Sequence, residues 1–98
     1  MKPTAIFINT GRGATVDEAA LVKALREGWI AFAGLDVFEE EPIGSKSTFL
    51  KMENAILTAH VASASSRMPL EARRRAAHEI RRVLQGEHPI SPVNQIMP

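Results

Sequence analysis

Short apolar runs alternate along this chain with segments whose apolar residues recur at the spacing of a helix. Three runs of strand length, at residues 5–8, 30–37 and 55–58, are mostly apolar. A continuous run such as the first is typical of a strand that is buried on both faces of a parallel sheet. Between the first two runs, a predicted helix presents a buried stripe of Ala20, Leu21, Ala24 and Leu25. The order strand, helix, strand predicts a parallel crossover and therefore an α/β fold.

Local signals predict where this first helix begins and ends. Thr15 and Glu18 have the spacing of a capping box, which predicts a helix that begins near Val16. Gly28 stands where a left-handed cap is expected to end the helix. Proline, glycine and serine predict a loop over residues 39–47, and a single helical turn is predicted over residues 48–52, before the third strand.

A longer helix is predicted over residues 66–85, with Gly86 as its stop signal. We expect it to pack by an apolar stripe made of Ala72, Ala76, Ile80, Val83 and Leu84. The same helix carries a cluster of arginines at positions 73, 74, 75, 81 and 82. Glutamates are interleaved with them at helix-pair spacing and no aromatic residue accompanies them, which favours a solvated helix face over a nucleic-acid surface. The tail from Glu87 contains two prolines in six residues and is predicted to be an extended arm.

Composition narrows the class of protein without naming a partner. The chain has 98 residues, 45% hydrophobic residues, 23% charged residues and a formal net charge of +1, which describes an ordinary soluble globular segment. Cysteine is absent, so the chain has no disulfide framework and no thiolate zinc site, in keeping with a reducing compartment. The apolar run near the N-terminus is too short for a signal peptide or a membrane span. We therefore expect a cytoplasmic protein that binds neither membranes nor nucleic acid, and we expect no metal site.

Three polar residues follow the three predicted strands: Arg12, Glu41 and His60. In an open parallel sheet, ligands bind outside the carboxyl ends of the strands, so these side chains could converge on one site. Each residue also has a simpler interpretation. Arg12 could be an exposed loop cation, Glu41 could be part of a solvated acidic run, and His60 could be a structural histidine. The flanking glycines favour a role for Arg12, because they let the backbone approach a ligand while the guanidinium binds a carboxylate in a bidentate manner. The strand-end position of His60, among small residues, favours a reactive role.

The run Gly11-Arg12-Gly13 also imitates a dinucleotide-binding fingerprint, because it follows a strand and precedes a helix, and Asp36 ends the next strand. The third glycine of that fingerprint is missing, and Val16 stands where close helix packing requires it. We therefore favour the strand-end site over this interpretation.

Several motifs in the same order make the chain similar to one known family. They are Ile-Asn-Thr-Gly-Arg-Gly at 8–13, Val-Asp-Glu at 16–18, Gly-Leu-Asp-Val-Phe at 34–38, Glu-Pro at 41–42 and Asn-Ala-Ile-Leu-Thr-Ala-His-Val-Ala at 54–62. Over nearly its whole length the chain resembles the C-terminal part of the D-isomer-specific 2-hydroxyacid dehydrogenases, which include glyoxylate, hydroxypyruvate and phosphoglycerate dehydrogenases. The resemblance implies the C-terminal half of a Rossmann-like NAD-binding domain, with three parallel strands, crossover helices and a long C-terminal helix.

The resemblance also implies an activity and roles for individual residues. The activity is the interconversion of a small 2-keto acid and a D-2-hydroxy acid with NAD or NADP. Arg12 would bind the substrate carboxylate, His60 would donate the proton in reduction, and Glu41 would orient the imidazole and favour its charged form. Asp36 would lie near the nicotinamide carboxamide. Backbone at Thr10, Gly11 and Arg12, and at His60, Val61 and Ala62, would line the cofactor.

The sequence also departs from the family pattern, and these departures change what the chain alone is expected to bind. Ala59 stands where the family usually has proline, and Gly11 replaces a more common alanine or serine. Neither the Gly-x-Gly-x-x-Gly segment nor the substrate domain has a counterpart here, so residues 1–98 are expected to be a C-terminal portion whose tail, residues 87–98, returns toward the substrate domain. Such a piece is expected to bind a dinucleotide weakly or not at all by itself and to be inactive alone, and the full-length protein is expected to be a homodimer. The alternative is a catalytically silent half-Rossmann module that oligomerises through its open sheet edge.

Overall fold

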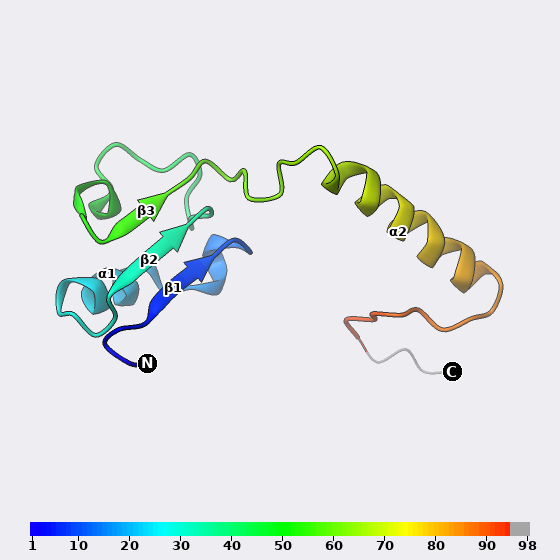
Figure 1. Cartoon of the computed structure of the whole chain (residues 1–98), viewed down its shortest axis with the longest axis horizontal. Coiled ribbons are helices and arrows are strands. Elements are labelled where there is room, and N and C mark those ends of the chain that lie inside the picture. Colours follow the sequence, from blue (N-terminus) through cyan, green and yellow to red (C-terminus); the bar gives the residue numbers. More distant parts are fainter. Residues whose placement is uncertain (95–98) are drawn as a thin grey trace. The chain divides into compact units, whose positions relative to one another are not determined.

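The computed structural model describes residues 1–94, which divide into two compact units at residues 62 and 63. The first unit contains three strands, one α-helix and two 3-10 turns, drawn in Figure 1. The strands are β1 (Ile6–Asn9), β2 (Phe32–Leu35) and β3 (Ala55–Leu57). The helix α1 is Glu18–Arg26, and the 3-10 turns are η1 (Gly13–Thr15) and η2 (Thr48–Lys51). The second unit contains the helix α2 (Met68–Leu84).

The three strands form one parallel sheet in the order β1-β2-β3. In its register, Asn9 of β1 pairs with Leu35 of β2, and Leu35 pairs with Leu57 of β3. All three strands therefore end at the same edge of the sheet. The predicted α/β fold with parallel strands is confirmed, and the predicted helical turn before the third strand is η2.

The start of α1 differs from the predicted capping box. Asp17 is the N-cap, and its carboxylate accepts a hydrogen bond of 2.9 Å from the backbone N–H of Ala20. Thr15 instead ends the turn η1, where its hydroxyl donates to the carbonyl oxygen of Arg12 at 2.6 Å. The prediction was wrong because the chain makes this extra turn before it enters the helix. The predicted left-handed cap is confirmed, since Gly28 has a φ of 69°.

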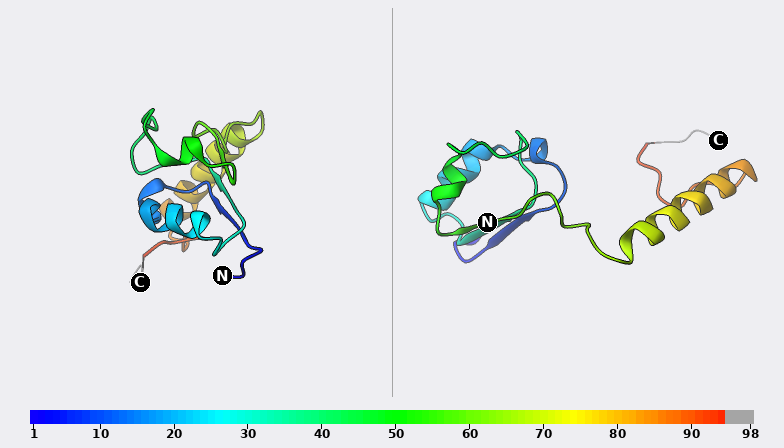
Figure 2. Two further views of the ribbon diagram at one scale, coloured as in Figure 1. Left: turned by 90° about the vertical axis from the view of Figure 1, so that its left-hand side faces the viewer. Right: turned by 90° about the horizontal axis from the view of Figure 1, so that it is seen from above.

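The hydrophobic core lies on one face of the sheet. Figure 2 shows α1 and η2 on the same side of the strands. The buried residues of this core are Leu21, Leu25, Ile30, Ala33, Leu35, Phe38 and Phe49. Of the predicted helix stripe, Ala20 is exposed and Ala24 is half-buried, so two leucines supply most of the helix's contact.

The opposite face of the sheet is apolar and exposed. Ile6, Ile8 and Ile56 are 64%, 69% and 62% exposed, so the prediction that the first strand is buried on both faces was wrong. The reason is geometric: successive side chains of a strand point to opposite faces, and α1 and η2 both pack on the face of Phe7 and Asn9. The sequence run is apolar on both faces, although only one is covered within residues 1–62.

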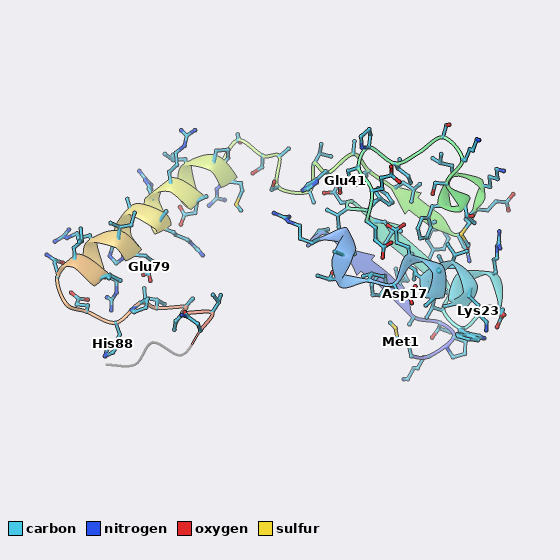
Figure 3. All side chains as sticks on the ribbon, turned by 180° about the vertical axis from the view of Figure 1, so that it is seen from behind. Met1, Asp17, Lys23, Glu41, Glu79 and His88 are labelled. Carbon is cyan, nitrogen blue, oxygen red and sulfur yellow. The ribbon has the colours of Figure 1, made fainter. Side chains whose placement is uncertain are left out.

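The second unit is the helix α2 followed by a returning tail. The predicted stripe does not pack: α2 contains no buried residue, and Ile80, Val83 and Leu84 are all more than half exposed. Within residues 63–94, the described contacts between the helix and the tail are polar, so this unit supplies no apolar cover for the stripe. The N–H of Ile90 donates to Glu79 at 2.8 Å, and Figure 3 labels Glu79 on α2 and His88 in the tail.

A salt bridge of 3.2 Å joins Glu71 and Arg75 on α2, as expected for a solvated helix face, and a second, of 2.8 Å, joins Arg82 of the helix to Glu87 of the tail. Gly86 has a φ of 79° just beyond the helix, where a stop was predicted. The last four residues of the predicted arm, 95–98, lie outside the described residues. Within residues 1–94, no helix combines the length and the apolar composition that a bilayer crossing requires.

Candidate active site

The loop that carries Arg12 is shaped by the buried side chain of Asn9, which is 8% exposed at the end of β1. Its Oδ1 accepts from the N–H of Gly11 at 3.0 Å, and its Nδ2 donates to the carbonyl oxygen of Arg12 at 3.1 Å. The guanidinium of Arg12 itself is exposed, and its Nη1 donates to the carbonyl oxygen of Gly11 at 2.7 Å. The loop backbone is therefore fixed while most of the donors of Arg12 stay open to a ligand.

The same loop lies directly against the segment that follows β2. A Cβ atom at Gly13 would lie 1.9 Å from the carbonyl carbon of Phe38, so the backbones touch and no side chain fits between them. Glu18, the second residue of the predicted capping box, also reaches this segment, where its Oε1 accepts from the N–H of Glu39 at 2.8 Å. These contacts join the loops after β1 and β2.

Glu41 and His60 form a hydrogen-bonded pair between the loops after β2 and β3. The Oε2 atom of Glu41 lies 2.7 Å from Nδ1 of His60, and its Oε1 atom accepts from the N–H of Phe38 at 3.0 Å. Glu41, labelled in Figure 3, is thus held at both carboxylate oxygens. Because Nδ1 faces the carboxylate, the other ring nitrogen, Nε2, remains for a substrate.

The carboxylate of Glu41 is stabilised in its charged form. The hydrogen bond from His60 lowers the pKa of Glu41 below its ordinary value of 4.5, with smaller contributions from the N–H of Phe38 and from the charges of His60 and Arg12. Glu41 is therefore a carboxylate at neutral pH, able to hold the imidazole by a charge-assisted bond.

His60 has a backbone conformation that is rare for a residue with a side chain. Its φ is 54°, and it is the one non-glycine residue of the described chain with a positive φ. Such conformations cost about 1–3 kcal/mol and concentrate at functional sites, where the surrounding structure maintains them. Its side chain is 46% exposed, so the imidazole is accessible at the strand end.

Asp36 lies at the centre of this strand-end region and is only 4% exposed. Its Oδ1 accepts from the hydroxyl of Thr58 at 2.5 Å and from the N–H of Val61 at 2.9 Å. Its Oδ2 accepts from the N–H of Ala62 at 2.8 Å. The hydroxyl of Thr58, followed by the two N–H groups and the charge of His60, lowers the pKa of Asp36 below 3.8 against the opposing effect of burial.

A cleft of about 350 Å³ opens beside the Glu41–His60 pair. Its walls come from the strand ends and from the loop after β2: Asp36, Phe38, Glu41, Pro42, Ile43, Thr58, Ala59 and His60. The cleft combines one apolar side with the predicted acid–base pair. A small polar molecule could therefore be held there with one atom against the imidazole.

The structure thus brings together three of the predicted site residues, Asp36, Glu41 and His60, and places the Arg12 loop against them. Thr10 and Gly11 are exposed at the end of β1. Val61 and Ala62 follow His60, but their N–H groups are already bonded to Asp36. They could meet a cofactor only through other atoms.

The sequence analysis assigned no role to Asn9 or Thr58, although both shape the site. One signal was available: a small polar residue stands at the end of each strand, because Asn9 is the last residue of β1 while Asp36 and Thr58 directly follow β2 and β3. A polar residue directly after a buried apolar run must find hydrogen-bond partners, and the nearest are the backbone groups of the following loop.

The residues present fit the nicotinamide end of a dinucleotide and not its pyrophosphate. Within residues 1–94, Oδ2 of Asp36 accepts one hydrogen bond, from Ala62, so it keeps capacity to accept a second, and Asp36 lines the cleft. The Gly-x-Gly-x-x-Gly segment that would bind the pyrophosphate is not in the sequence. Within residues 1–94, no cluster of side chains has the composition of a metal site.

The amino-acid sequence is similar to those of known proteins. Residues 1–62 match the sequence profile of the D-isomer specific 2-hydroxyacid dehydrogenase, NAD binding domain. A glyoxylate reductase from Aeropyrum pernix is 50% identical over 95 residues, which cover 97% of this chain and 28% of that protein. The chain thus spans less than a third of the length of this relative.

Solved structures show the same fold. A D-isomer specific 2-hydroxyacid dehydrogenase from Xanthobacter autotrophicus Py2, in complex with NADPH and MES, is 44% identical with a TM-score of 0.74; the match covers 96% of this chain and 38% of that one. An NADPH-dependent glyoxylate/hydroxypyruvate reductase from Sinorhizobium meliloti, in complex with NADP and malonate, is 43% identical with a TM-score of 0.66; the match covers 93% of this chain and 28% of that one. The predicted Rossmann-like α/β fold is confirmed.

Proposed function

Because the chain belongs to the D-isomer specific 2-hydroxyacid dehydrogenase family, we propose that it carries the acid–base and substrate-binding residues of an NAD(P)-dependent reductase of small 2-keto acids. The observation that carries this proposal is the contact of 2.7 Å between Glu41 and His60, on a sheet edge shared with the Arg12 loop. The relatives named glyoxylate reductase make glyoxylate the first substrate to test.

Arg12 binds the substrate carboxylate in this proposal. A guanidinium presents donors in a planar fork that matches both oxygens of a carboxylate. Asn9 and the packing at Gly13 fix the backbone on which the arginine stands. The 2-keto acid is thereby held in one pose, with its ketone directed toward His60.

His60 supplies the proton at the ketone oxygen. When bound, a nicotinamide cofactor provides the hydride that adds to the carbonyl carbon. Negative charge then develops on the carbonyl oxygen, and Nε2 of a protonated His60 stabilises that charge and transfers its proton to it. Glu41 holds Nδ1 throughout, so the imidazole keeps its orientation and its positive charge is balanced.

Asp36 and the backbone near residues 10–12 and 60–62 would hold the nicotinamide end of the cofactor. The free lone pair of Asp36 could accept a hydrogen bond from the carboxamide. Residues 1–62 would thus form one wall of a nucleotide-binding domain, and the groups that bind the pyrophosphate and shape the substrate side chain would come from outside this chain.

A steady-state assay of the full-length protein tests the proposal. Glyoxylate and hydroxypyruvate are each supplied with NADH or NADPH, and cofactor oxidation is followed by the loss of its near-ultraviolet absorbance. We expect saturable turnover of at least one of these two acids. We expect no turnover of the corresponding aldehyde or ketone in which a methyl group replaces the carboxylate. Equal rates with and without the carboxylate would contradict the role of Arg12.

A further inference from the structure

The conformation of the His60 loop depends on one buried side chain. Among residues 1–94, the backbone N–H groups of residues 59–62 make only two hydrogen bonds, from Val61 and Ala62, and both go to the carboxylate of Asp36. The loop contains the positive φ of His60, which a chain does not adopt without support. Asp36 therefore supplies the support that the loop backbone lacks.

Thr58 ties the near end of the same loop to the same carboxylate. Its hydroxyl donates to Oδ1 of Asp36 at 2.5 Å, while its backbone N–H donates to Leu35 at 2.9 Å within the sheet. Three donors, at positions 58, 61 and 62, thus converge on one acceptor and enclose His60 between them. A carboxylate suits this position because it only accepts, whereas an amide would present its own donor to one of these donors.

We propose that Asp36 is a positioning residue that holds the loop of residues 58–62 in the conformation in which His60 meets Glu41, with Thr58 as its second anchor. The inference rests on the proposed function and adds a role to Asp36 beside a contact with the cofactor. Asp36 acts on the reaction chiefly through the loop, because its oxygens bind Thr58 and the N–H groups of Val61 and Ala62, and no hydrogen bond within the described residues joins it to the imidazole.

Thr58 provides the sharper kinetic test, because it has no assigned contact with substrate or cofactor. In the full-length protein, Thr58→Val removes the hydroxyl at nearly constant shape, and we expect kcat to fall about 10-fold to 100-fold, the effect of a small displacement of a catalytic group. KM for the cofactor should stay within about twofold, since uniform binding is unchanged. Thr58→Ser restores the hydroxyl and should restore kcat. Unchanged kcat in Thr58→Val would overturn the proposal.

Asp36→Asn tests the role of the Asp36 carboxylate as the acceptor that holds the loop of residues 58–62. If Asp36 positions the loop, kcat falls at least as far as in Thr58→Val. If Asp36 serves only as a ligand of the cofactor, KM for the cofactor rises while kcat at saturation is unchanged, which would overturn the proposal.

Hydrogen exchange of the Val61 and Ala62 amides separates this inference from the proposed function. Both amides should be protected in the wild-type full-length protein, and at least one of them should exchange at least about tenfold faster in Asp36→Asn, because the amide side chain keeps only one of the two acceptor oxygens. Equal exchange in the two proteins would overturn the positioning role even if the enzyme reduces keto acids. A protein that reduces none of them but shows this loss of protection would contradict the proposed function and leave the role of Asp36 in the loop intact.

Discussion

At the scale of single residues, the site depends on the different roles of the two ring nitrogens of His60: Nδ1 binds Glu41, and Nε2 remains for the substrate. Nδ1 of His60 is held by Glu41 at 2.7 Å, and Glu41 is itself held by the N–H of Phe38. An imidazole fixed in this way presents Nε2 in one direction, which general acid catalysis requires. Arg12 differs from His60 because its backbone is fixed while its side chain remains exposed.

Replacing Arg12 by lysine tests the bidentate role of its guanidinium. Arg12→Lys keeps the charge but loses the planar fork, so we expect kcat/KM for the keto acid to fall by about 10-fold to 100-fold, with most of the loss in KM. Steady-state kinetics of the full-length protein measure both constants. Arg26→Lys, on the exposed side of α1, is the matched control and should leave them unchanged. An identical loss in both variants would count against substrate binding by Arg12.

The pH dependence of Glu41 tests its bond to His60. Since the folded pKa of Glu41 is lowered, its bond contributes stability above pH 4.5, and that contribution disappears as the pH falls through the lowered pKa. A carbon-detected NMR titration should therefore give a midpoint below 4.5. His60→Asn should move the midpoint back toward 4.5, whereas His78→Asn on α2 should not. A wild-type midpoint at or above 4.5 would show that the bond does not form in solution.

At the scale of elements, the parallel sheet positions the site because all three strands end at one edge. The loops after β1 and β2 lie in direct contact at Gly13, where the backbone of Phe38 occupies the place of a side chain. This contact sets the distance between the Arg12 loop and the Glu41 loop. Packing of backbone against backbone tolerates no added atom.

Adding a methyl group at Gly13 should therefore be costly. In Gly13→Ala the Cβ would lie 1.9 Å from the carbonyl carbon of Phe38, and we expect the free energy of unfolding to fall by roughly 1–3 kcal/mol or more. Gly44→Ala is the matched control, because no atom lies within 4 Å of its added Cβ, and it should change stability by less than about 0.5 kcal/mol. Urea unfolding of the full-length protein measures both. Equal stabilities of the two variants would be incompatible with the contact.

The elements themselves could largely be predicted from the sequence, since strand runs and helix periodicity are local signals. The positions of Arg12, Glu41 and His60 after the three strands predicted that they lie at one edge of the sheet. The direct contact of Glu41 with His60 agrees with that expectation. The capping box failed because Thr15 bonds within a preceding turn. The anchoring of the His60 loop could not be predicted, because Asp36 reaches donors 22 to 26 residues away, which depend on the finished sheet.

At the scale of the whole molecule, apolar surface remains uncovered in both units. Ile6, Ile8 and Ile56 form an exposed apolar face of the sheet, and the stripe of α2 is not covered by the described residues of its own unit. Exposed apolar surface of this kind marks places where other protein surfaces bind. The family relatives are more than three times as long as the matched stretch, which leaves ample protein to supply such surfaces.

The exposed face also bears on the alternative of a catalytically silent module that oligomerises. We expect the 98-residue chain alone to self-associate, so that its mass by light scattering rises with concentration. Ile8→Lys should reduce this association, while Ala19→Lys, at an exposed position of α1, should not. A wild-type chain that stays monomeric at every concentration would count against the alternative.

The central claim is that His60, held by Glu41, supplies the proton in the reduction of a 2-keto acid. The most direct measurement is the glyoxylate-dependent oxidation of NADH or NADPH by full-length wild-type protein, His60→Asn and the control His78→Asn. We predict that kcat falls by about 10²-fold to 10⁴-fold in His60→Asn, the usual contribution of a general acid, and is unchanged in the control. Wild-type activity in His60→Asn would contradict the claim.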